Sequence, residues 1–139
     1  MNHKSLNNHR FRYSVLQGRF AVCRLASDAA VPEWVAGAHF QSITRTANEL
    51  SIVCEQSLVP VTIHAECDWV CLQLQGPFPF EMTGVLAAIL NPLADAEVGI
   101  IAVSTFDTDY VLVKEERLQA AKDALLRAGH ERIAATSAS

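Results

Sequence analysis

A group of polar side chains lies between two apolar runs, in the stretch VGIIAVSTFDTDYVLVK from Val98 to Lys114. Two carboxylates and three hydroxyls are concentrated there: Ser104, Thr105, Asp107, Thr108 and Asp109. A carboxylate in such a turn can bind an ammonium group through charge-assisted hydrogen bonds. The same residues also form ordinary turns, because Asp hydrogen-bonds to its own turn backbone. The stretch is therefore either a simple strand connection or part of a ligand site.

The bulk composition restricts the classes of protein to be considered. The chain has 139 residues and a mass of 15.2 kDa, and half of its residues are apolar while 19% are charged. This composition favours a packed globule over a disordered chain. The net charge of -4, without a basic block, argues against nucleic-acid binding. We find neither a membrane-spanning run nor a signal-peptide core, and we expect a cytoplasmic protein.

No motif in the sequence indicates an enzyme or a cofactor. A phosphate-binding glycine loop is missing, and no histidine has an acid or a nucleophile at readable spacing. Four cysteines are present: Cys23, Cys54, Cys67 and Cys71. Reduced core thiols are the expected state in a cytosolic chain. A metal site at His64, Cys67 and Cys71 is the alternative, although the spacing does not match a zinc knuckle.

Hydrophobic periodicity divides the chain into strands and helices. It predicts strands over residues 18–25, 39–46, 49–56, 68–76, 99–106 and 109–114, and helices over residues 81–96 and 115–130. A short helix is expected within residues 27–37, capped by Ser27 or Asp28 with Pro32 in its first turn. Residues 57–67 remain ambiguous because Pro60 prevents a long helix.

The order strand, helix, strand, strand, helix in the second half is repeated more weakly in the first half. We therefore predict a first unit over residues 10–66 and a second over residues 67–133. Residues 1–9 and 134–139 are predicted to be flexible tails.

The element order and one motif resemble ACT domains. The run Gly99-Ile100-Ile101, followed by STF at 104–106 and DYVLV at 109–113, is similar to the ACT modules of CASTOR-type arginine sensors and of a family of small bacterial ACT-like proteins. Those modules are related to the regulatory part of aspartate kinases. The stronger part of the resemblance covers residues 76–128. It implies an α+β fold with two ACT-like, ferredoxin-like βαββα units, whose antiparallel sheets lie side by side with helices on one face.

The resemblance also implies a bound amino acid at the seam between ACT units. Matched by motif, the ligand-binding residues are Thr83, Gly84, Val85, Gly99, Ile100, Thr105, Phe106 and Asp109. One position departs from the pattern. Aspartate kinases often have an Asp in the strand matching residues 99–103, where this chain has Ile101, which weakens a transfer of lysine or threonine specificity.

The chemistry of these residues agrees with an amino-acid ligand. Backbone N–H groups at a helix start near Thr83 and Gly84 suit a carboxylate, and Gly84 permits close approach. Asp109 suits the ammonium, with Asp107 as the alternative. Phe106 is placed to close over an apolar side chain or the stem of arginine.

These observations lead to one functional expectation and one alternative. We expect a non-catalytic regulatory protein that binds a free amino acid, arginine first and a neutral amino acid second, and that acts on a separate partner. We also expect a homodimer, because ACT-like sheets have exposed edges and half of the residues are apolar. The alternative is a structural dimer module that binds no ligand.

Overall fold

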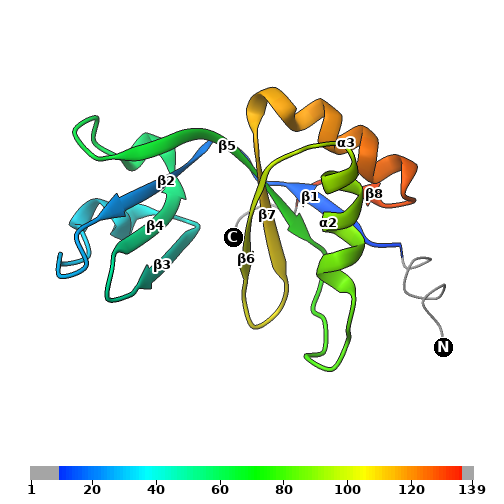
Figure 1. The fold of residues 1–139 in the computed structure, drawn as a ribbon, viewed down its shortest axis with the longest axis horizontal. Helices are drawn as coiled ribbons and strands as arrows, with labels where there is room; N and C mark the ends of the chain where they lie inside the picture. The colour runs from blue at the N-terminus through cyan, green and yellow to red at the C-terminus, as the bar shows by residue number, and fades with distance from the viewer. Residues whose placement is uncertain (1–9, 136–139) are drawn as a thin grey trace. The chain divides into compact units, whose positions relative to one another are not determined.

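The computed structural model describes residues 10–135, and Figure 1 labels its strands and α-helices. Its strands are β1 (Arg12–Val15), β2 (Phe20–Leu25), β3 (Gln41–Arg45), β4 (Leu50–Glu55), β5 (Ala65–Leu74), β6 (Ile100–Ser104), β7 (Asp109–Lys114) and β8 (Glu131–Arg132). Its helices are η1 (Glu33–Gly37), η2 (Gln56–Leu58), α2 (Val85–Asp95), η3 (Glu115–Arg117) and α3 (Leu118–Arg127), where η marks a 3-10 helix. Among these residues no helix is long and apolar enough to cross a membrane.

The chain forms two compact units, which we call the first unit and the second unit. The first unit comprises residues 17–70. Among the described residues, the second unit comprises residues 10–16, which include β1, and residues 71–135. The sequence-based boundaries assign residues 10–16 to the first unit, whereas β1 pairs with the last residues of β5, Tyr13 with Leu74 and Val15 with Leu72. The predicted tail 1–9 and residues 136–139 lie outside the described residues.

The sheet of the second unit has the strand order β6-β7-β5-β1-β8. The β6–β7 hairpin is antiparallel, and its register joins Ile100 to Val113 at one end and Ser104 to Asp109 at the other. Strand β8 pairs with β1 in the parallel direction, which departs from the all-antiparallel sheet predicted from the sequence. The polar turn of residues 105–108 therefore lies at the tip of a hairpin.

Two helices cover one face of this sheet. Helix α2 directs Val85, Ile89 and Leu93, spaced one turn apart, into a core that also holds Ala121 and Leu125 of α3. The sheet contributes buried residues to the same core: Tyr13, Leu72, Leu74, Val111 and Val113. Burial of each large aliphatic side chain stabilises the unit by roughly 1.5–3 kcal/mol. The predicted placement of helices on one face is confirmed here (Figure 1).

The first unit has the strand order β3-β4-β2-β5, and each pairing is antiparallel. Its core contains Ala21, Cys23, Val35, Leu50, Ile52 and Cys54. The short helix expected in residues 27–37 is the 3-10 helix η1, but the predicted caps are wrong. Pro32 occupies the N-cap with extended backbone and no side-chain cap, so the helix begins only at Glu33. The α+β class with ACT-like elements is confirmed.

Candidate functional site

The turn at the tip of the β6–β7 hairpin is closed by its own hydroxyl groups. The backbone N–H of Thr105 donates to the carbonyl of Thr108 at 2.8 Å, and the Thr105 hydroxyl donates to the same oxygen at 3.0 Å. The Thr108 N–H donates back to the Thr105 hydroxyl at 3.3 Å. Thr108 is buried, and its own hydroxyl donates to the carbonyl of Leu74 at 2.8 Å. Thr105 thus closes the turn, and the Thr108 hydroxyl attaches it to Leu74 of β5.

Asp109 lies beside this turn as the first residue of β7 and is half-buried. The Ser104 hydroxyl donates to Asp109 Oδ1 at 2.5 Å, across the last pair of the hairpin. A carboxylate offers about four acceptor positions, so one donated hydroxyl leaves capacity for a ligand ammonium. The Ser104 hydroxyl therefore fixes the position of the Asp109 carboxylate and leaves its negative charge available to a ligand.

The loop before α2 packs closely against the turn. The Phe78 N–H donates to the carbonyl of Asp107 at 2.9 Å. A Cβ at Gly76 would lie only 2.8 Å from that same oxygen, so the loop approaches this closely because residue 76 has no side chain. The peptide bond between Gly76 and Pro77 is cis. These contacts bring residues 76–82 and residues 104–109 together.

The loop, the turn and the start of α2 enclose a shallow hollow of about 240 Å³, which we call the turn concavity. It is lined by Phe78, Pro79, Phe80, Met82, Val85, Ser104, Thr105, Phe106, Asp107, Thr108 and Asp109. The rings of Phe80 and Phe106 meet edge to face, with centroids 4.9 Å apart, although the two side chains are 71% and 79% exposed. Small-molecule pockets commonly occupy roughly 300–1,000 Å³, so this hollow suits only a small ligand.

The structure brings together four of the residues that the sequence nominated: Val85, Thr105, Phe106 and Asp109 line the turn concavity. Gly84 is the N-cap of α2 with φ of 81°, directly before Val85, and has no side-chain cap hydrogen bond. Thr83 precedes it and is exposed.

Two nominated residues lie elsewhere. Gly99 and Ile100 are at the opposite end of the hairpin from the turn, because Ile100 pairs with Val113 while Ser104 pairs with Asp109. Neither residue lines the turn concavity.

The aromatic wall of this hollow is not among the site residues predicted from the sequence. Residues 77–80 fall between the predicted strand 68–76 and the predicted helix 81–96, yet Phe78 and Phe80 both line the concavity. The available signal was the presence of large apolar side chains in a proline-rich loop, where polar residues are more usual.

Burial governs the titration of groups near this hairpin. Burial raises the pKa of Tyr110, and the nearby Cys71 and the carboxylate of Asp107 raise it further. Burial also raises the pKa of the Cys71 thiol to about 12. Cys23, Cys54, Cys67 and Cys71 are all free thiols. Within residues 10–135 no three His, Cys, Asp or Glu side chains gather in a way that could hold a metal ion.

Two family models match separate parts of this chain. The model of an ACT-domain family matches residues 64–127, and a second family model, which describes an N-terminal domain, matches residues 18–62. The second match falls within the first unit, and the ACT match covers β5 to α3. Residues 64–127 of this chain therefore match an ACT domain, in agreement with the fold described above.

The chain is similar over nearly its whole length to protein Atu0741 of Agobacterium tumefaciens. The two are 37% identical, with a TM-score of 0.86, and the match covers 94% of this chain and 98% of that one. The regulatory subunit of aspartate kinase from Thermus flavus has a similar fold, with a TM-score of 0.60 and 11% identity over 84% of this chain and 95% of that one.

A human protein, CASTOR3P, is 28% identical over 92 residues, which are 57% of this chain and 56% of the human protein. The chain thus matches little more than half the length of that curated relative.

Proposed function

We propose that this protein is a non-catalytic regulatory module that binds a free amino acid, or a similar small zwitterion, in the turn concavity. One observation carries the proposal. Asp109, held by the Ser104 hydroxyl, lies in the same hollow as Val85, the first residue of α2. A fixed anion and a helix start are the two partners that an amino acid's ammonium and carboxylate require.

In this binding mode the ligand ammonium contacts Asp109. The carboxylate accepts hydrogen bonds from the first-turn N–H groups of α2, which a helix start leaves without intrahelical acceptors. Gly84 allows close approach there, and Thr83 lies at the entrance. Phe106 and Phe80 cover the ligand side chain. Arginine is the first candidate, because two aromatic rings suit its stem and guanidinium, and a neutral amino acid is the second.

The relatives support a regulatory role. A similar fold occurs in a protein described as the regulatory subunit of aspartate kinase, and the human relative is a CASTOR protein, of the type that the sequence resembles. We propose that ligand binding changes the affinity of this protein for a separate partner protein, which carries the activity being regulated.

A thermal-shift screen of the twenty amino acids at millimolar concentration tests the proposal, since a ligand that binds only the folded state raises the melting temperature. We expect one amino acid to do so. Asp109→Asn keeps the shape of the side chain and should weaken that binding by about tenfold or more, the equivalent of roughly 1.4 kcal/mol.

Asp28→Asn, at an exposed position of the first unit, is the matched control for the lost negative charge. If no amino acid shifts the wild-type protein and calorimetry is also silent, the amino-acid proposal fails. If a ligand binds equally well to Asp109→Asn, the site is placed wrongly.

A second candidate function is a structural dimer module. It is favoured by β6, which pairs with β7 and with no other strand of the described chain, so that one of its edges has backbone groups available for another chain. We propose that the protein is a homodimer in either case. Sedimentation at micromolar concentration should give twice 15.2 kDa. A dimer without any amino-acid response would favour this second function.

A further inference from the structure

The first unit contains a pocket of about 720 Å³, formed entirely by residues of that unit. We call it the first-unit pocket. Its volume lies within the range of about 300–1,000 Å³ that small-molecule sites commonly occupy. The turn concavity belongs to the second unit, so the two hollows share no residue.

The pocket exists because the first unit lacks a helix that the second unit has. In the second unit, α3 follows the β6–β7 hairpin and directs Ala121 and Leu125 into the core. The corresponding segment of the first unit, between β4 and β5, contains only the three residues of η2 and a loop. The pocket opens between this segment and the adjoining ends of β2 and β5.

The apolar wall of the pocket is built from Val59, Ile63, Ala65 and Cys67, which are partly buried and pack against the core. Val61 lines the mouth with its side chain fully exposed. Hydrogen bonds hold the wall in place, since the N–H of Val59 donates to Gln56 at 3.1 Å and that of Ile63 to Pro60 at 3.1 Å.

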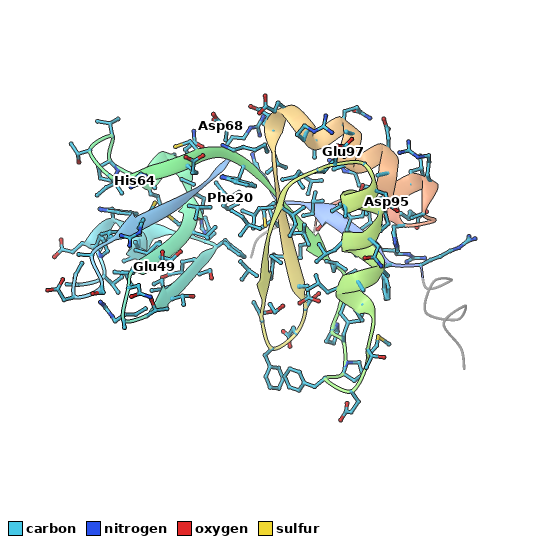
Figure 2. The ribbon with its side chains drawn as sticks, viewed as in Figure 1. Phe20, Glu49, His64, Asp68, Asp95 and Glu97 are labelled. Atoms are coloured by element: carbon cyan, nitrogen blue, oxygen red, sulfur yellow. The ribbon has the colours of Figure 1, made fainter. Side chains whose placement is uncertain are left out.

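The side chain of Gln56 is itself fixed by Asp68, which Figure 2 labels. Gln56 Oε1 accepts the N–H of Asp68 at 2.6 Å, and Gln56 Nε2 donates to Asp68 Oδ1 at 3.2 Å. The polar and apolar parts of the wall are therefore preformed, as they are in most ligand pockets.

Two charged side chains of opposite sign line the pocket, Arg19 and Glu55. The Glu55 carboxylate accepts the backbone N–H groups of His39 at 2.8 Å and Phe40 at 3.2 Å, one on each oxygen, which fixes its position. Each of its oxygens keeps a further lone pair. The exposed guanidinium of Arg19 has five N–H donors, so it can bind a carboxylate in addition to its contacts within the protein.

One anion, one cation and an apolar wall complement a zwitterion that has an apolar side chain. We propose that the first-unit pocket binds a free apolar amino acid, with its carboxylate on Arg19, its ammonium on Glu55 and its side chain against Val59 and Ile63. This second site stands on residues of the first unit alone and does not depend on the function proposed for the turn concavity.

Cys67 provides a reporter inside the pocket. It is half-buried, whereas Cys23, Cys54 and Cys71 are buried, and burial raises the pKa of those three thiols. The folded protein is treated with iodoacetamide, and alkylation of Cys67 is followed by peptide mass spectrometry with and without L-leucine. We expect labelling to slow about threefold at a leucine concentration of about twice Kd, because the accessible fraction is 1/(1 + [L]/Kd).

Analogues and variants assign the contacts. 4-Methylpentanoate lacks the ammonium and 3-methylbutylamine lacks the carboxylate, so each should protect Cys67 less than leucine does. Arg19→Gln should abolish protection by leucine. Val61→Asp places a negative charge at an exposed position of the mouth without disturbing the core, and it should weaken protection as well. Asp109→Asn should leave protection unchanged, which separates this site from the turn concavity.

The second readout needs no reagent: in ¹⁵N–¹H NMR spectra, leucine should shift the amide signals of residues 55–67. If leucine neither slows the labelling of Cys67 nor shifts these amides, the proposal is overturned. Full protection in Arg19→Gln, or equal protection by 4-methylpentanoate, would also overturn it, because the zwitterion contacts would then be wrong.

Discussion

His130 compensates for a proline within helix α2. Pro92 lies inside this helix and has no N–H, so it cannot donate to the carbonyl of Ala88 four residues earlier. His130 Nε2 lies 2.9 Å from that carbonyl oxygen, while the N–H of Phe11 donates to His130 Nδ1 at 3.0 Å. Since Nδ1 accepts, the neutral ring carries its proton on Nε2 and donates to Ala88. One buried side chain thus connects the segment before β1 with α2.

The substitution His130→Phe keeps a planar ring next to Phe11, with which His130 is stacked at 5.8 Å, and removes both hydrogen bonds. Each of these two partly buried groups costs roughly 1–3 kcal/mol when it loses its partner, so we expect the free energy of unfolding to fall by about 2–6 kcal/mol. In a Pro92→Ala background, residue 92 has an N–H for the carbonyl of Ala88. In that background His130→Phe should lower the free energy of unfolding by about 1 kcal/mol less than in the wild-type protein. This difference is the coupling energy between positions 92 and 130.

Urea unfolding followed by far-ultraviolet circular dichroism measures this effect, because α2 and α3 both belong to the second unit. Trp34 and Trp69 both lie in the first unit, so tryptophan fluorescence reports on that unit separately. His39→Phe, at an exposed position, is the matched control and should change the stability by about 0.5 kcal/mol or less. If His130→Phe lowers the free energy of unfolding equally with and without Pro92, His130 does not compensate for the proline. If the loss is below about 1 kcal/mol, the two hydrogen bonds of His130 contribute less to stability than we infer.

Two further predictions concern the second unit and the buried thiols. Gly76→Ala should destabilise the second unit by about 1–3 kcal/mol in the same urea assay, because its Cβ would meet the carbonyl of Asp107 at 2.8 Å. Gly99→Ala, whose Cβ would meet nothing within 4 Å, is its control, and equal effects of the two would contradict the steric argument. Burial raises the pKa values of Cys54 and Cys71 to about 12, so the unfolded chain loses these protons at lower pH than the folded protein. The free energy of unfolding should therefore fall as the pH rises above the ordinary thiol pKa, by up to about 1.4 kcal/mol per pH unit and thiol. Urea titrations at neutral and alkaline pH measure this slope, which Cys71→Ala should reduce; a stability that rises with pH would contradict the prediction.

The elements that the sequence predicted well are those with a strong local pattern. Helices α2 and α3 carry apolar residues at helical spacing, and the β6–β7 hairpin consists of two apolar runs around a polar turn. Strands β1 and β8 were missed because their stability comes from distant partners: β1 pairs with β5, some sixty residues later in the chain, and the two-residue β8 pairs with β1. Strands as short as β1 and β8 do not show a hydrophobic period, so the local sequence does not reveal them or their distant partners.

The candidate site was also predictable only where the local sequence has a clear pattern. The turn motif and the helix start placed Val85, Thr105, Phe106 and Asp109, which line one hollow. The aromatic wall at Phe78 and Phe80 depends on a close approach between Gly76 and the carbonyl of Asp107, which is a tertiary contact. The first-unit pocket depends on a missing helix, and the ambiguous pattern of residues 57–67 gave no reason to expect a cavity there.

The parallel pairing of β1 with β8 determines the order in which the protein can assemble during synthesis. The first unit is one continuous stretch of residues 17–70, so it can fold as soon as that stretch leaves the ribosome. The second unit needs Tyr13 from the beginning and Arg132 from near the end of the described chain, which lie opposite each other in the β1–β8 pair. Until residues 131–132 have been made, β1 has one open edge and His130 has not reached the N–H of Phe11. From the point at which residue 70 has emerged until residues 131–132 follow, the nascent chain therefore contains every residue of the first unit, while β1 of the second unit still lacks one of its two partner strands.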